Sequence, residues 1–150
     1  LEVSEGGLVA GASEAQAWLQ GFQSLGLGLV LDDFGTGYSS LGCLKRFPVD
    51  TLKIDRAFVS ELPADPEDVS LVRAVIAMAR ALGVEVIAEG VETEEQLHLL
   101  RELGCHHVQG FLFSRAVPGT RIPHLARHLG IDDQGRVRRG DDLRLVSSRP

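Results

Sequence analysis

The sequence predicts an α/β fold built from parallel βα units. Three segments with helical apolar spacing end in a Leu-Gly pair, and a strand-like apolar run follows each of these pairs: Leu25-Gly26, Leu82-Gly83 and Leu103-Gly104. Each of these runs leads to an oxygen-bearing side chain, namely Asp32, Glu89 and Gln109. Helices and strands that alternate in this way are typical of parallel sheets. The C-terminal ends of the strands are therefore expected to meet at one rim, where α/β proteins place their functional sites.

The composition indicates a single globular domain and excludes several classes of protein. The chain has 150 residues, 44% of them hydrophobic, and a net charge of −6, which argues against a nucleic-acid polymer as partner. Cys43 and Cys105 lack the spacing of a zinc site, so free thiols in a reducing compartment are expected. No apolar run is long enough for a membrane span and no signal peptide is visible. A cytoplasmic location is therefore expected.

In the first third of the chain we expect three strands and two helices. The helix signal begins at Ser13, which is a suitable N-cap, and its apolar face carries Trp18, Phe22 and Leu25, with Leu19 beside them. Pro48 stops a second, shorter helix. The expected elements in chain order are a strand at Leu1 to Glu5, a helix at Ser13 to Leu25, a strand at Leu27 to Leu31, a helix at Ser40 to Phe47 and a strand at Thr51 to Asp55.

The remainder of the chain continues the alternation. Thr93, followed by Gln96 three residues later, predicts a capping box at the start of a helix that ends at Gly104. Residues 131–150 are polar and rich in Arg and Asp, so a flexible tail is expected there. The other expected elements are a helix at Glu67 to Leu82, strands at Val84 to Ala88 and at His107 to Phe113, and a helix at Ile122 to Leu129.

Asp32 and Asp33 are the most informative pair in the sequence. They end a buried apolar run, and two adjacent carboxylates repel each other unless a positive charge lies nearby. A divalent cation with oxygen ligands would provide that charge; the alternative is a helix N-cap next to a solvated aspartate. The predicted rim also holds Lys53, Glu89 and Gln109, which suits a metal-assisted hydrolase of phosphate esters. A plain sheet with surface acids remains the rival interpretation.

Four motifs resemble those of EAL domains, the cyclic di-GMP phosphodiesterases of bacterial signalling. The first, Leu31 to Leu41, reads Leu-Asp-Asp-Phe-Gly-Thr-Gly-Tyr-Ser-Ser-Leu. The opening residues Leu1 to Glu5 are similar to the family's Leu-Glu-x-Thr-Glu strand, and the resemblance extends to Pro118. The other three motifs are Pro48 to Asp55, Ala88 to Thr93 and Gln109 to Ser114.

The resemblance implies a TIM-like (β/α) barrel of the EAL type. The Glu-Ala-Leu strand that names the family is absent, so about the second half of the barrel, five strands with their helices, is expected within residues 1–130. The parent domain is expected to hydrolyse cyclic di-GMP to pGpG with two Mg²⁺ or Mn²⁺ ions. These residues alone are expected to be inactive, because upstream metal ligands are missing. The alternative is a non-catalytic EAL-like module that binds cyclic di-GMP or a protein partner.

The resemblance also implies a role for each matching residue. Glu2, Asp32, Asp33 and Glu89 are the expected metal ligands, with Asp32 bridging two ions. Lys53 is expected to contact the catalytic water, Asp33 to serve the second ion, and Glu89 to act as a ligand of that ion or as a base, so that all three are expected catalytic residues. The expected partners are cyclic di-GMP, a second copy of the chain, and upstream GGDEF (diguanylate cyclase) or sensory domains. The expected supporting residues are Glu5, which braces the Asp-Asp loop, Asp55, Gln109, and the loop toward the dimer interface with Gly35, Thr36, Gly37 and Tyr38.

Overall fold

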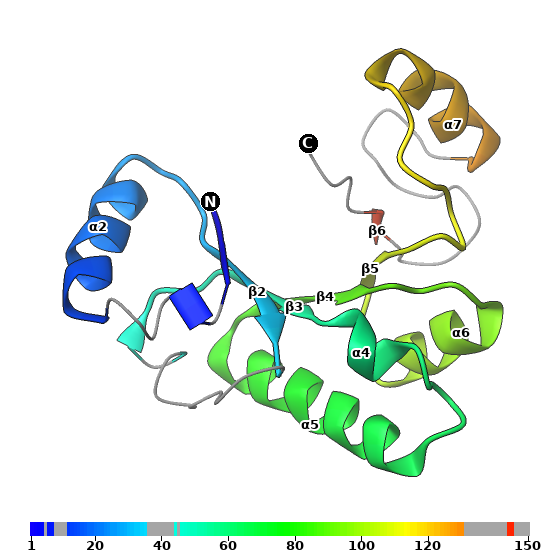
Figure 1. Ribbon diagram of the computed structural model, residues 1–150, viewed down its shortest axis with the longest axis horizontal. Helices are drawn as coiled ribbons and strands as arrows, with labels where there is room; N and C mark the ends of the chain where they lie inside the picture. Colours follow the sequence, from blue (N-terminus) through cyan, green and yellow to red (C-terminus); the bar gives the residue numbers. More distant parts are fainter. Residues whose placement is uncertain (5, 8–11, 36–43, 45, 131–143, 146–150) are drawn as a thin grey trace.

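The chain forms a sheet of six parallel strands in sequential order (Figure 1). The computed structural model describes residues 1–150 except 5, 8–11, 36–43, 45, 131–143 and 146–150. Sequential parallel order is the order of strands in a (β/α) barrel, and the predicted α/β class is confirmed. The strands are β1 (Glu2–Ser4), β2 (Val30–Phe34), β3 (Thr51–Ile54), β4 (Glu85–Glu89), β5 (His107–Gln109) and β6 (Arg144–Leu145).

Helices separate most of the strands along the chain. Figure 1 shows α5 running beside the strands, whereas α2 and α7 lie at opposite ends of the molecule. In the part of the chain that the structure describes, no helix is both long and apolar enough to cross a membrane. The helices are α2 (Ala12–Ser24), α4 (Arg56–Val59), α5 (Pro66–Leu82), α6 (Glu94–Glu102) and α7 (Ile122–His128), the last preceded by the 3₁₀ turn η1 (Gly119–Arg121).

The two central helices begin and end where their sequences predict. In α5 the carboxylate of Asp65 accepts a hydrogen bond from the Glu67 N–H, Pro66 occupies the first turn, and Gly83 ends the helix with a φ of 72°. In α6 the predicted capping box is confirmed, because Thr93 and Gln96 exchange side-chain and backbone hydrogen bonds. Local capping chemistry therefore sets the bounds of both helices.

Helix α2 differs from the prediction in the residues that it buries. Leu19 is buried, but Trp18 is 70% and Leu25 is 74% exposed. The apolar face expected at Trp18, Phe22 and Leu25 therefore lies largely open to solvent. Figure 1 shows the helix standing apart from α5 and the centre of the sheet.

The strands differ from the prediction at their ends. β2 starts at Val30 and continues through both aspartates to Phe34, because a bulge keeps it paired with β3. β5 ends at Gln109 rather than Phe113, because the chain turns there and the Leu112 N–H donates to the Val91 carbonyl.

The remaining differences concern short or undescribed segments. The short helix α4, capped by the Asp55 side chain, was not predicted. The helix expected at Ser40 to Phe47 falls mostly outside the described residues. So does the expected tail, apart from Arg144–Leu145, which pair with β5 as β6.

The core lies on the face of the sheet that packs against the helices. Side chains that alternate along β2, β3 and β4 are almost completely buried there, and α5 and α6 contribute further apolar residues. The carbonyl ends of the strands are thereby held rigidly at one rim. The side chains with at most 1% exposure are Leu31, Leu52, Ile54, Val59, Val72, Ala79, Ala88, Val91, Leu100, Cys105 and Val108.

Candidate active site

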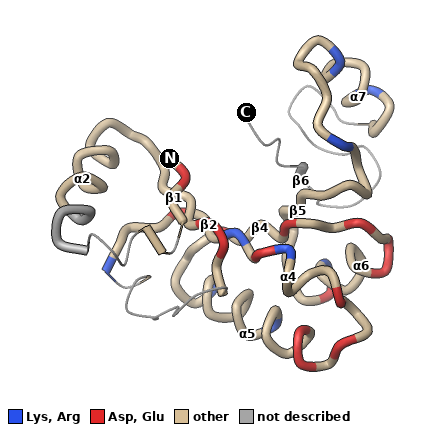
Figure 2. The backbone as a smooth tube through the Cα atoms, in the orientation of Figure 1, with Lys and Arg blue, Asp and Glu red and all other residues tan. Residues whose placement is uncertain are grey.

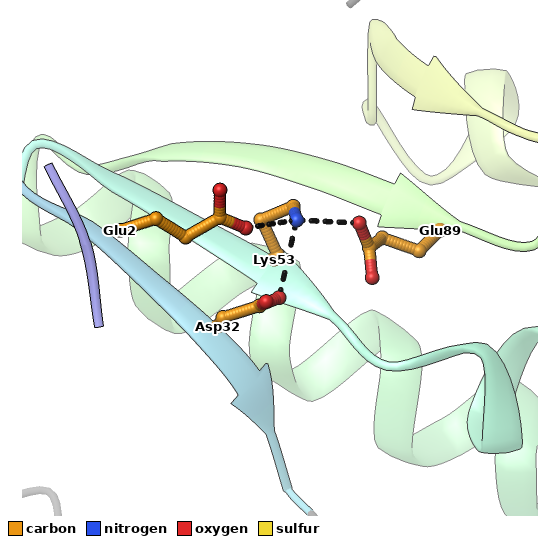
Figure 3. Close-up of polar contacts among 4 residues, drawn as sticks. All are labelled: Glu2, Asp32, Lys53 and Glu89. Carbon is orange, nitrogen blue, oxygen red and sulfur yellow. Dashed lines mark hydrogen bonds and ion pairs between the residues drawn. The ribbon is translucent and has the colours of Figure 1, made fainter. Parts of the chain in front are cut away.

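Lys53 lies at the centre of a cluster of carboxylates on the open face of the sheet (Figure 3). Its Nζ atom forms ion pairs with Glu2 Oε1, with Asp32 Oδ1 at 3.2 Å and with Glu89 Oε1 at 2.6 Å. These partners come from β1, β2 and β4, whereas Lys53 itself lies on β3. Residues 87 positions apart in the sequence thus meet at one point, as the prediction of a shared rim required.

Strand alternation places Lys53 on this face. Its neighbours Leu52 and Ile54 are 0% and 1% exposed on the opposite face, against the helices, so the lysine between them points away from the core. In the register of β3 and β4, Lys53 is opposite Ile87, and Glu89 lies two residues further along. Lys53 and Glu89 therefore share a face, and the long lysine side chain spans the step between them.

A β-bulge in β2 sets the orientation of the two aspartates. Leu31 pairs with Leu52 and Phe34 with Ile54, so Asp32 and Asp33 together stand opposite the single residue Lys53. Asp33 has a φ of 56°, a left-handed conformation that aspartate tolerates better than most residues. The extra residue returns Phe34 to the buried face and leaves Asp32 facing Lys53.

In this cluster, burial and the neighbouring charges shift the pKa values in opposite directions. Burial lowers the pKa of Lys53, but its interactions with the carboxylates of Glu2, Glu89 and Asp32 raise it more, so the ammonium remains charged at neutral pH. Burial also raises the pKa of Glu89, an effect that Lys53 counteracts. The side chain of Lys53 is only 12% exposed, so little water is available to screen these charges.

The site as a whole carries an excess of negative charge. Desolvation and the adjacent carboxylates of Asp32 and Asp55 raise the pKa of Asp33. Figure 2 shows acidic and basic segments next to each other around β1, β2 and β4. With all groups ionised, three carboxylates around one ammonium leave two uncompensated negative charges. Such a site attracts a divalent cation.

The donor atoms fit a hard divalent metal. All the acidic groups at this rim offer oxygen ligands, which Mg²⁺ and Mn²⁺ prefer. Asp32 Oδ1 is buried and has no hydrogen-bond partner in the structure, so it has lone pairs to offer to a cation. Its 3.2 Å contact with Lys53 is an ion pair without hydrogen-bond geometry. Among the described residues, no three acidic, His or Cys side chains are already arranged to hold a metal ion.

The other predicted site residues lie around this cluster or outside the described chain. Asp55 caps α4, accepting a hydrogen bond from the Ala57 N–H at 2.8 Å. Gln109 ends β5, in register with Glu89. Gly35 follows the bulge with a φ of 100°, and a Cβ there would lie 2.7 Å from the Phe58 ring. The expected site residues that fall outside the described part are Glu5, Thr36, Gly37 and Tyr38.

Two rim glycines were not singled out from the sequence. A Cβ on Gly90 would lie 2.6 Å from the Arg56 side chain, and a Cβ on Gly110 would lie 1.9 Å from the Val91 carbonyl oxygen. Gly90 directly follows Glu89, and Gly110 directly follows Gln109. Each glycine thus permits a close approach next to a predicted site residue, and its position directly after a polar strand end was the available signal.

Comparison with known proteins identifies the family. The EAL domain model matches residues 1–116. The chain is 46% identical over 132 residues to the cyclic di-GMP phosphodiesterase NbdA of Pseudomonas aeruginosa, which covers 88% of this chain and 17% of NbdA. The crystal structure of the EAL domain of Mycobacterium smegmatis DcpA superposes with a TM-score of 0.79 at 47% identity, covering 85% of this chain and 57% of the other.

A second similar structure contains metal and nucleotide. It is a manganese and cy-diGMP complex of Klebsiella pneumoniae BlrP1, with a TM-score of 0.73 and 37% identity over 76% of this chain and 29% of the other. The present chain thus spans less than a fifth of NbdA and little more than half of the DcpA chain. By family match, identity and structure together, the chain belongs to the EAL domain family.

Proposed function

We propose that the chain provides part of the active site of a cyclic di-GMP phosphodiesterase that hydrolyses its substrate to pGpG. The convergence of Lys53 with three carboxylates from neighbouring parallel strands carries this proposal. Membership of the EAL family and the name of the relative NbdA support it. Cyclic di-GMP has two phosphodiester bonds, and cleavage of one of them opens the ring.

The proposed metal ligands are Glu2, Asp32, Asp33 and Glu89. Asp32 would hold a metal ion through its buried Oδ1 atom, which lacks a hydrogen-bond partner. Two Mg²⁺ or Mn²⁺ ions would supply an activated water and neutralise charge on the phosphate. The manganese in the BlrP1 complex supports this choice of metal.

Lys53 has a charge role in the proposed mechanism. Its ammonium stays protonated, so it donates hydrogen bonds and cannot serve as a base at neutral pH. We assign it to orienting the attacking water or stabilising charge on the phosphate. Glu89, whose pKa is raised by burial, is the better proton acceptor.

The supporting residues hold the rim in place around these groups. Asp55 fixes the turn after β3 by capping α4, and Gln109 offers an amide at the end of β5. Glu5 and the loop with Thr36, Gly37 and Tyr38 are assigned by family resemblance. A dimer formed through that loop remains part of the proposal, and an analytical ultracentrifugation run on the chain would test it.

The 150 residues by themselves are proposed to bind metal weakly and to turn over little substrate. The similar DcpA chain has a large portion that this sequence does not match, and the expected Glu-Ala-Leu strand is not among the residues present. The alternative is an EAL module that binds cyclic di-GMP without cleaving it. The two can be distinguished by measurement, because such a module leaves cyclic di-GMP intact after incubation.

The test is chromatographic detection of pGpG after incubation of cyclic di-GMP with Mn²⁺. Two proteins are compared: residues 1–150, and a longer chain extended upstream of Leu1 by the part of an EAL domain that this sequence does not match. We expect product from the longer chain and little from the shorter one. Binding of cyclic di-GMP without product from either chain would contradict the proposal and favour the binding module.

A further inference from the structure

We propose that Lys53 is a built-in counter-cation that competes with a divalent metal for the carboxylates of this site and is displaced when the metal binds. This inference rests on the metal-dependent function proposed above. It adds a second state of the same residue. In that state three carboxylates engage the ammonium, so it is not free to act on water or phosphate.

The contacts of the ammonium support this occupancy. Nζ reaches carboxylates from three different strands, with Glu89 Oε1 at 2.6 Å and Asp32 Oδ1 at 3.2 Å (Figure 3). The third partner is Glu2. These are three of the four acids proposed as metal ligands, so the ammonium already engages carboxylate oxygens that a metal would need. The ammonium offsets the mutual repulsion of the three carboxylates and keeps them converged.

A metal ion and the ammonium compete for the same oxygen atoms. Mg²⁺ lies at about 2.1 Å from its oxygen ligands, so a metal bound to these oxygens would approach Nζ far more closely than two positive charges tolerate. Asp32 Oδ1 has no hydrogen bond to lose, which makes it the atom at which an entering metal meets least competition.

Because metal displaces the ammonium, metal binding determines whether Lys53 is held by the carboxylates or released from them. Before metal binds, the charge of Lys53 is fully engaged by carboxylates. After metal binds, those carboxylates belong to the metal, and the ammonium is released toward the open face of the sheet. The cationic side chain thus becomes available only once metal is present.

The decisive variant is Lys53→Met, which keeps an unbranched side chain of similar length but removes the charge. Binding of Mn²⁺ to residues 1–150 is measured by electron paramagnetic resonance of free Mn²⁺. We expect K53M to bind Mn²⁺ about tenfold or more tightly than the unmodified chain, because the competing cation is gone.

Arg73→Met is the matched control. Arg73 is exposed on α5, so R73M removes the same unit of charge away from the site, and we expect no change in its Mn²⁺ affinity. An affinity of K53M no higher than that of the unmodified chain would overturn the proposal, including the case in which neither protein binds Mn²⁺. So would an equal increase in R73M, since that would reflect net charge alone.

A second measurement uses the unmodified chain and does not depend on the folding of any variant. Amine acetylation at Lys53 is followed by mass spectrometry with and without Mn²⁺, with Lys45, the other lysine of the chain, as reference. We expect Mn²⁺ to increase labelling of Lys53 relative to Lys45 severalfold, because the ammonium leaves its carboxylates. Unchanged or reduced labelling would overturn the proposal. Neither readout involves hydrolysis, so a displaced lysine in a protein that cleaves nothing would refute the proposed function alone.

Discussion

The two faces of the central strands carry different properties of this protein. On one face Leu52, Ile54 and Ala88 are at most 1% exposed and pack into the core. On the other face Asp32, Lys53 and Glu89 form a charged cluster. Lys53 lies directly between Leu52 and Ile54 in the sequence, so a period of two residues separates stability from chemistry. Substitutions on one face should therefore leave the property of the other face largely intact.

The largest expected effect is on the buried face. Leu52→Ala removes a fully buried side chain and should lower the free energy of unfolding by about 2–5 kcal/mol, as cavity-forming substitutions do. Chemical denaturation measures this loss. Leu82→Ala makes the same chemical change at a side chain that is 42% exposed, and should cost about 0.5 kcal/mol or less. Equal losses in the two variants would mean that the core is not where the structure places it.

The next largest effect on stability is expected at Gly110, at the rim where the two faces meet. Gly110→Ala places a Cβ atom 1.9 Å from the Val91 carbonyl oxygen. The backbone there must move, which threatens the 3.0 Å hydrogen bond from the Val91 N–H to the Gln109 carbonyl. We expect a loss of about 1–3 kcal/mol, typical of overpacking, in thermal or chemical unfolding. Gly119→Ala, where no atom lies within 4 Å of the added carbon, is the control and should change little.

The sequence was sufficient for the elements whose signals are local. The Gly83 terminus of α5 and the Thr93–Gln96 capping box both depend on residues within a few positions of each other. The meeting of Asp32, Lys53 and Glu89 also followed, since parallel strands align their C-terminal ends.

What the sequence did not predict depends on pairing between distant strands. The bulge at Asp32 and Asp33 exists only relative to the register of β3. The same holds for the close packing at Gly110, which involves the backbone of Val91 on another loop. The ion pairs of Lys53 likewise required knowing how far its side chain reaches along the neighbouring strands. The solvent exposure of Trp18 on α2 was missed because helical periodicity shows an apolar face, not what covers that face.

A smaller effect tests the local signals. Thr93→Ala removes the side-chain acceptor of the Gln96 N–H and should cost about 1 kcal/mol of stability, without altering the charged face. Ser70→Ala is the comparison, because the Ser70 hydroxyl only donates back to the Pro66 carbonyl within its own helix. A Thr93→Ala chain as stable as the parent would show that the capping box is not needed to hold α6.

The smallest effect on stability comes from the buried thiol of Cys105 and appears only at alkaline pH. Burial raises the pKa of the Cys105 thiol from its ordinary value of 9.0 to about 11. The folded state therefore favours the protonated thiol, and this contribution to stability is complete below pH 9 and is lost as the pH rises toward 11.

The measurement for Cys105 is the urea midpoint as a function of pH, with Cys43→Ser in both proteins so that they differ only in the thiol of Cys105. The chain that retains Cys105 should lose more stability between pH 8 and pH 10.5 than the chain with Cys105→Ala, which has no thiol to ionise. Parallel curves for the two proteins would contradict the assignment of a protonated, buried thiol.

The separation of the two faces is tested most directly by Asp32→Asn in the longer, upstream-extended chain. This change keeps the shape of the side chain and removes the charge of the proposed metal ligand. Turnover of cyclic di-GMP with Mn²⁺ and the unfolding midpoint are measured on the same preparation. The account predicts that turnover falls by about a hundredfold or more, whereas the unfolding midpoint stays close to that of the parent. Retained turnover, or a loss of stability as large as that of Leu52→Ala, would contradict it.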